Sequence, residues 1–271
     1  MTLDAAERTT QDIKSVIEGV ARGELNELRG VGFYNRTWIT TERFCRIGDG
    51  VDSLEFYIHS LWHIYYQLAL HTSSDSLEHS RIVLDIARIQ GIGELVRPVS
   101  GPYGHDVART RDGTLWVDLP FFVADMSKFW TTNYAALPGT QRLNFASFLA
   151  KTASVRVAKD KLCQIALMLF RNTFEEERDI GTKDDPDKNG PEHENMPLTV
   201  TQLLPAVAEW IREAGHVLLE IADSEWNACS SEFSAGGRAF KESPFYQRAA
   251  PGFSPMRWMF WIKKLRISLT G

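Results

Sequence analysis

The sequence predicts an all-α fold, a single helical domain of about seven or eight helices arranged around one buried helix. Apolar residues recur at helical spacing along most of the chain, and no run alternates apolar with polar residues as a half-exposed strand does. The stretch 158–174 is apolar on all sides, which is typical of a central, buried helix. No internal repeat divides the 271 residues, so we treat 1–271 as one domain.

The first half of the chain contains three predicted helices before an irregular stretch. The first helix covers 13–20 and the second, with the strongest apolar stripe, covers Ser53 to His71. The third is capped by Asp75 or Ser76 and runs to about Gln90, where glycines stop it. Residues 91–115 are expected to form a loop with a short hairpin at 112–113, and 115–122 leads into a helix through 130.

The second half opens with the longest helical tract, 141–178, which we expect to be broken near Ser154. Residues 179–198 hold six acids, three prolines and two glycines, and we therefore expect a flexible acidic loop. Thr199 caps the next helix, in which Pro205 marks the first turn or a kink. After an irregular segment at 230–253, Ser254 and Pro255 start a final helix.

Composition excludes several classes of protein. The net charge of −5, from 30 basic and 35 acidic side chains, argues against a nucleic-acid-binding protein. The three scattered cysteines form neither a disulfide framework nor a metal-binding pair. No signal peptide is visible, and the longest run of large apolar residues, 165–170, is too short to span a membrane. We therefore expect a cytoplasmic protein.

Four segments together resemble a fungal family of all-helical proteins of unknown function. They are SLWHIYYQLALHTSSDSLEHSRIVLDIARI, LWVDLPFF, LTVTQLLPAVAEWIREAG and GFSPMRWMFWIKKL. The most specific parts are the Leu-Trp-x-Asp-Leu-Pro and Gly-Phe-Ser-Pro-x-Arg-Trp-x-x-Trp stretches, and the likeness covers roughly residues 50–265. The resemblance implies an α-helical fold and, because some members accompany natural-product gene clusters, a role in small-molecule biosynthesis. It brings no catalytic residues.

Three patterns could bind a metal, and we favour a simpler interpretation of each. Glu55, His59 and His63 lie one turn apart, but on the polar side of their helix. The run from Asp185 to Gly190 is half of a calcium loop that lacks its final glutamate. Asp184, Asp185 and Asp187 lie in a loop, outside the helical setting in which a terpene cyclase holds magnesium. We therefore predict no metal site, although the acidic loop leaves calcium binding open.

No motif points to a cofactor. Gly91-x-Gly93 lacks the third glycine of a dinucleotide-binding turn and follows a helix. The chain has neither a phosphate-binding GxxxxGK[ST] motif nor the GxSxG of a serine hydrolase. The sequence therefore predicts chemistry that needs no cofactor, or no chemistry at all.

Aromatic residues are the positive feature, with eight Trp, seven Tyr and fifteen Phe. Aromatic side chains with polar tips line small-molecule pockets, although they also simply fill helical cores. The candidates for a substrate-binding pocket around the central helix are Trp62, Tyr65, Tyr66, Trp116, Phe121, Trp130 and Trp210.

Polar groups on or beside the central helix are further candidates. Gln164 and Arg171 lie within its nominally buried length, and Arg156 precedes it. A buried guanidinium needs a partner. Pairing of Arg171 with Glu175, one turn on, is the simpler interpretation. Otherwise Arg156, Gln164 or Arg171 could polarise a ligand carbonyl.

Two classes of function remain. The favoured one is a cofactor-independent enzyme, or a binding protein, for a small hydrophobic fungal metabolite, with isomerisation or ring closure as the chemistry. The alternative is a helical interaction or regulatory module. Its protein partner would then dock on exposed apolar residues among 258–261, unless these residues pack the last helix onto the core. No catalytic residue is predicted.

Overall fold

The computed structural model describes residues 37–100, 104–181 and 197–270, and side chains to 267. It divides the chain into two compact units, the first ending at Phe129 and the second starting at Trp130. The predicted helix at 13–20 and most of the predicted acidic loop lie outside the described residues. That the chain forms one domain stays a prediction.

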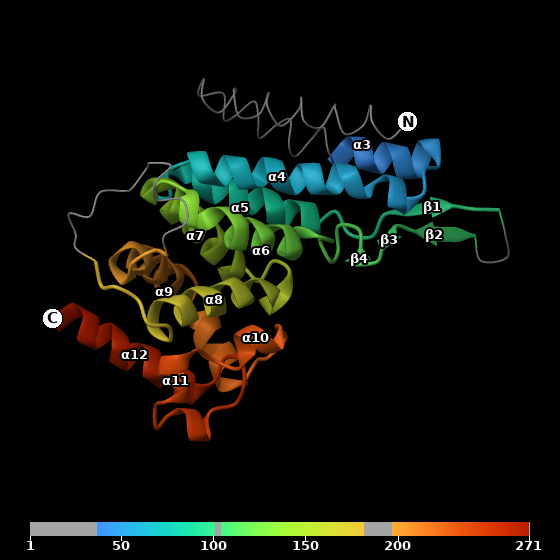
Figure 1. Ribbon diagram of the computed structural model, residues 1–271. Coiled ribbons are helices and arrows are strands. Elements are labelled where there is room, and N and C mark those ends of the chain that lie inside the picture. The colour runs from blue at the N-terminus through green and yellow to red at the C-terminus, as the bar shows by residue number, and fades with distance from the viewer. Residues whose placement is uncertain (1–36, 101–103, 182–196, 271) are drawn as a thin grey trace. The chain divides into compact units, whose positions relative to one another are not determined.

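The described part of the first unit contains three α-helices, the start of a fourth and two strand pairs. The helices are α3 (Thr37–Glu42), α4 (Glu55–His71), α5 (Leu77–Gln90) and the first part of α6 (Phe122–Asn133). The long helices α4 and α5 lie side by side (Figure 1). Ten of the seventeen residues of α4 are buried, among them Ile58, Leu61 and Leu68. The stripe predicted from apolar spacing is therefore the face that builds this core.

The helix boundaries of this unit follow the predicted signals. The Ser76 hydroxyl accepts a hydrogen bond from the backbone N–H of His79, 3.2 Å away, and so caps α5. Gly91 ends the same helix. The predicted hairpin at 112–113 is present as the antiparallel pair β3 (Arg109–Thr110) and β4 (Gly113–Thr114).

A second strand pair lies in what the sequence predicts to be loop. Strands β1 (Val96–Pro98) and β2 (His105–Val107) are antiparallel, with Val96 opposite Val107. Three residues per strand are too few to show an alternating pattern, so the prediction of a loop is wrong here. The predicted all-α class is confirmed, because the two small strand pairs are a minor part of the described chain.

The second unit packs its helices around α8. Its described α-helices are the end of α6, α7 (Gly139–Ser154), α8 (Cys163–Phe174), α9 (Val200–Asp223), α10 (Ser231–Ser234), α11 (Arg238–Lys241) and α12 (Pro255–Thr270). Three 3₁₀ turns accompany them: η4 (Tyr134–Ala136), η5 (Lys159–Leu162) and η6 (Tyr246–Arg248). The most extensive helix packing is that of α7 against α9, and α8 also packs on α9 and α12. Nine of the twelve residues of α8 are buried, as its all-round apolar sequence predicts.

The predicted break in the long helical tract is confirmed, and it is wider than expected. Helix α7 ends at Ser154, and α8 begins only at Cys163. Between them Arg156, Ala158 and Lys159 have φ of 56–57°, a left-handed conformation that no α-helix tolerates. The buried helix therefore starts later than the apolar pattern indicates.

The last two long helices begin as predicted. Thr199 and Gln202 form a reciprocal capping box at the start of α9, and Pro205 is accommodated inside that helix. The Ser254 hydroxyl accepts a hydrogen bond from the backbone N–H of Arg257 at the start of α12. In the parts of the chain that the structure describes, no helix combines the length and apolarity needed to cross a membrane.

Candidate functional site

A half-open pocket of about 230 Å³ lies within the second unit. Its walls come from the end of α6 and η4, from α8, from the residues around the start of α9, and from α10. Most of the lining is aromatic or aliphatic, namely Trp130, Tyr134, Ala135, Met168, Leu169, Pro197, Leu198, Leu203 and Phe233. The polar lining residues are Thr131, Asn172 and Arg178. Apolar walls with a few polar groups are typical of small-molecule sites, but this volume lies below their usual range of about 300–1,000 Å³, so the pocket suits only a small ligand.

The aromatic wall of the pocket is anchored in the core. The rings of Trp130 and Tyr134 are stacked with centroids 3.8 Å apart, and the Trp130 ring lies 6.0 Å from that of Phe145 in α7. Burial raises the pKa of the Tyr134 hydroxyl well above its ordinary value, with the nearby Arg142 charge opposing the shift. The hydroxyl is therefore neutral at physiological pH.

Arg178 carries the charge of this pocket. Its Nε donates to the backbone oxygen of Asn172, and its Nη1 donates to that of Leu198, 3.0 Å away. These bonds tie the end of α8 to the chain that enters α9. Burial lowers the pKa of the Arg178 guanidinium because it penalises the charged form, and the charge of Glu176 partly offsets this.

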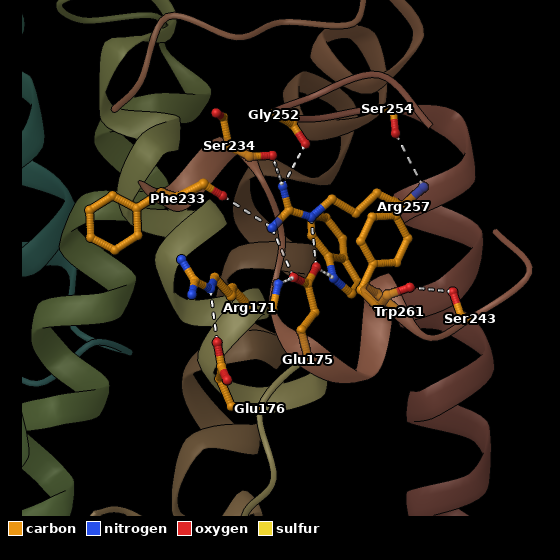
Figure 2. A network of polar contacts seen from close by, with 12 residues as sticks. Arg171, Glu175, Glu176, Phe233, Ser234, Ser243, Gly252, Ser254, Arg257 and Trp261 are labelled. Atoms are coloured by element: carbon orange, nitrogen blue, oxygen red, sulfur yellow. Dashed lines mark hydrogen bonds and ion pairs between the residues drawn. The ribbon is translucent and has the colours of Figure 1, made fainter. Parts of the chain in front are cut away.

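The same unit contains a fully buried ion pair between Glu175 and Arg257 (Figure 2). Arg257 donates from Nε and Nη2 to the two carboxylate oxygens, at 2.6 and 2.9 Å. Its remaining N–H groups donate to the backbone oxygens of Phe233, Ser234 and Gly252. The Glu175 carboxylate also accepts from Trp261 Nε1 and from the backbone N–H of Gly237, both at 2.6 Å. All five N–H donors of the guanidinium are used.

This network shows that the Gly-Phe-Ser-Pro-x-Arg-Trp-x-x-Trp stretch has a structural role. Gly252 has φ of +80°, and a Cβ there would overlap the backbone oxygen of Trp226. Ser254 caps α12, while Arg257 and Trp261 reach Glu175 from successive turns of that helix. The bond from Arg257 to Phe233 holds α10, whose Phe233 side chain lines the pocket.

The Leu-Trp-x-Asp-Leu-Pro stretch is a strained turn in the first unit. Trp116 and Leu119 have positive φ, which costs free energy in residues with a Cβ. The turn is held by the Asp118 carboxylate, which accepts from the backbone N–H of Thr114 at 2.8 Å. The Pro120 backbone oxygen accepts from Trp62 Nε1, also at 2.8 Å. This stretch therefore shapes the packing around Trp62.

The histidines that the sequence suggests as metal ligands have other partners. His59 Nδ1 lies 2.7 Å from the Asp125 carboxylate, and its ring stacks on Phe121 with centroids 4.5 Å apart. The hydrogen bond to Asp125 raises the pKa of His59, against the opposing effect of burial. Burial lowers the pKa of His63. Within the described ranges no group of three or more His, Cys, Asp or Glu side chains could hold a metal ion.

The predicted site residues are divided between the two units. Five are buried in the first unit: Trp62, Tyr65, Tyr66, Trp116 and Phe121. In the second unit, Trp130 lines the pocket, whereas Trp210 is buried elsewhere in α9. Gln164 is half-buried on α8, and the exposed Arg156 pairs with Asp160 and Glu220. The structure thus brings Trp130 to the pocket, and a binding role for the others stays a prediction.

The predicted pairing of Arg171 with Glu175 is wrong. Arg171 Nε instead donates to Glu176, 2.9 Å away (Figure 2). Its Nη1 donates to the backbone oxygen of Glu232. Glu175 belongs to Arg257, which lies 82 residues further along the chain. Helical spacing reports only local neighbours, so it could not indicate this partner.

Sequence reasoning missed Tyr134, Asn172 and Arg178 as pocket residues. The signal that pointed to Gln164 and Arg171, a polar side chain on a mostly apolar helix, applies equally to Asn172. Arg178 lies beyond the end of α8, where no periodicity constrains its direction.

The apolar residues at 258–261 divide between core and surface. Phe260 and Trp261 are buried, so they pack α12 onto its unit. Met259 is exposed. The predicted apolar surface on this helix is therefore narrower than the whole stretch 258–261.

Comparison with known proteins places this structure in a family. No solved structure matches the chain. A curated relative, the "Oxopyrrolidines biosynthesis cluster protein G" of Penicillium oxalicum (strain 114-2 / CGMCC 5302), is 51% identical over 264 residues, which cover 97% of this chain and 74% of the relative. The model of a family described as "Protein of unknown function (DUF3632)" matches residues 62–265. The chain therefore belongs to this fungal family, DUF3632, whose function is unknown.

Proposed function

We propose that this protein works in fungal secondary metabolism and binds a small, largely apolar metabolite in the pocket of the second unit. The protein then isomerises this metabolite, or closes a ring in it, without a cofactor. The observation that carries the proposal is the pocket itself, which combines Trp130, Tyr134 and Phe233 with polar groups from Asn172 and Arg178. The name of the 51% identical relative supports the metabolic setting.

The lining suits a reaction in which substrate and product contain the same atoms. Apolar walls can hold a flexible substrate in its reactive conformation, which converts much of the entropic barrier into binding. The amide of Asn172 and the guanidinium of Arg178 are donors that can stabilise charge developing on a carbonyl oxygen. Neither effect requires a metal or a nucleotide.

The test compares two neighbouring alanines of η4. Both are exposed, but only Ala135 lines the pocket, so a tryptophan at Ala135 fills it whereas one at Ala136 does not. Purified protein is screened by thermal shift against fractionated metabolites of a fungal culture. A ligand at about 100 times its Kd stabilises the protein by about 2.7 kcal/mol.

We expect one apolar fraction to raise the Tm of the wild type and of Ala136→Trp, and to leave Ala135→Trp unshifted. Turnover appears as a new chromatographic peak of unchanged mass. If the shift survives in Ala135→Trp, the ligand binds elsewhere and the proposed site is wrong.

The alternative function, a helical interaction module, is favoured by one observation. Helix α12 exposes Met259, Ile262 and Ile267, the last with 58% of its surface accessible. Absence of a ligand in every fraction, together with capture of a defined partner that Ile267→Glu abolishes, would support this function instead.

A further inference from the structure

The charge of the described pocket lining is concentrated on one residue. Among its twelve described residues Arg178 is the only charged one, and the other walls are aromatic, aliphatic or neutral polar. The acidic neighbours Glu177 and Asp179 belong to an adjoining, more open hollow that shares Arg178. A ligand in the pocket therefore meets one cation, and no other charge, among the lining residues that the structure describes.

The hydrogen bonds of Arg178 do not neutralise its charge. Both of its bonds reach backbone oxygens, those of Asn172 and Leu198, and neither oxygen carries a full negative charge. The nearby Glu176 carboxylate accepts its hydrogen bond from Arg171 instead. A guanidinium has five N–H donors, of which the two backbone bonds use two.

The two backbone bonds also fix the direction of the side chain. They hold Nε and Nη1 against the ends of two chain segments, so the guanidinium plane is set before a ligand arrives. A planar, fixed guanidinium matches a planar oxyanion better than a flexible ammonium does, because it can donate two parallel hydrogen bonds.

We propose that the pocket is selective for anions. It takes a small molecule with an apolar, unsaturated body and one delocalised oxyanion, which pairs with Arg178. This oxyanion is a carboxylate or the enolate of a 1,3-dicarbonyl. This inference rests on the proposed function in one respect, that the pocket is the ligand site. It adds the chemical class of the ligand and the residue that selects it.

The test uses 2-naphthylacetate and 2-naphthylacetamide, which have the same shape and differ in charge. Their binding to the full chain is followed by ligand-observed NMR and by calorimetric titration. Charge-assisted hydrogen bonds give the acid an expected advantage of about 10- to 100-fold in Kd over the amide. Arg178→Gln should abolish that advantage by weakening the acid alone, and Arg178→Lys should retain part of it.

Two controls separate the possible failures. Arg212→Gln removes an exposed cation of α9 that pairs with Glu209 and does not line the pocket, and it should leave both Kd values unchanged. Ala135→Trp should abolish binding of both probes. Binding that survives in Ala135→Trp, or no binding of either probe to the wild type, would overturn the pocket and with it the proposed function.

If Ala135→Trp blocks both probes but acid and amide bind the wild type equally, the anion selectivity is wrong and the proposed function stands. The same conclusion follows if Arg178→Gln weakens both probes alike. Thermal unfolding shows whether Arg178→Gln is folded. If it is not, the comparison of the two probes on the wild type and on Arg178→Lys decides.

Discussion

Two arginines of the second unit have opposite surroundings, and the difference separates a structural role from a binding one. Arg257 is fully buried, and all five of its N–H groups donate to protein oxygens, including both oxygens of Glu175. Arg178 is half-buried, and its two bonds to described residues reach only backbone oxygens. A saturated network has no donor left for a ligand, whereas a cation with donors to spare at the wall of a pocket can select one.

The largest expected effect comes from removing Arg257, the arginine whose N–H donors are all used. Arg257→Met leaves the Glu175 carboxylate buried without its counter-charge, which should lower the free energy of unfolding by about 3–5 kcal/mol. Urea denaturation followed by tryptophan fluorescence measures this loss. Arg238→Met, which removes an exposed arginine, is the control and should leave the midpoint unchanged.

A double variant tests whether unpaired charge is the cause. Glu175→Leu combined with Arg257→Met removes both charges and should be more stable than Arg257→Met alone. Equal stability of the single and double variants would mean that the orphaned carboxylate costs no more than the packing and the Trp261 and Gly237 donors that Glu175→Leu leaves without an acceptor.

The next largest effect concerns Gly252, whose backbone oxygen accepts one of the hydrogen bonds of Arg257. Gly252→Ala places a Cβ against the Trp226 oxygen at a φ of +80°, and should cost about 1–3 kcal/mol. Gly215→Ala is the matched control, since Gly215 lies within α9 and a methyl group there would meet no atom within 4 Å beyond the backbone of its own helix. Alanine at 215 should stabilise the protein by up to about 1 kcal/mol. Equal Tm values for the two variants would contradict the close approach at Gly252.

Arg178 should matter much less for stability than Arg257. Arg178→Gln removes two hydrogen bonds to backbone oxygens at a half-exposed position, which we expect to cost about 1 kcal/mol. The same denaturation experiment measures this cost. A loss as large as that of Arg257→Met would show that Arg178 is a structural residue, and the contrast between the two arginines would not hold.

The smallest expected effect concerns a partly exposed pair of side chains in the first unit, His59 and Asp125. Asp125 raises the pKa of His59, so the pair stabilises the fold fully below the ordinary histidine pKa of about 6.5, and this contribution is lost as pH rises through the raised pKa. His59 is 43% exposed, so the pair is worth at most about 1 kcal/mol. Asp125→Asn should lower the His59 pKa in an NMR titration, with His71 as the internal reference. An unchanged His59 pKa would refute the pairing.

Local structure can be predicted from the sequence wherever one turn of chain decides it. The cap at Ser76, the capping box at Thr199 and the start of α12 at Ser254 all depend on neighbours within three residues. The all-round apolar sequence of α8 likewise predicts its burial. These features require no knowledge of distant partners.

The pocket and the ion pair cannot be predicted in the same way. Spacing pairs Glu175 with Arg171 because it shows only helical neighbours, while the true partner of Glu175 is 82 residues away. Of the pocket walls, the sequence predicts only Trp130, since Asn172, Arg178 and Phe233 meet there through the packing of separate elements. Tertiary packing, and not local pattern, assembles this site.

Because Glu175 and Arg257 lie far apart in the sequence, they can pair only late in the synthesis of this part of the chain. At about 5–20 residues per second, the ribosome adds the intervening 82 residues in about 4–16 s. Throughout that interval the Glu175 carboxylate has no arginine, and the α10 backbone that carries Phe233 lacks its anchor. The pocket is therefore completed only after Arg257 has been added, and a nascent chain that stops short of this residue lacks the anchor of one pocket wall.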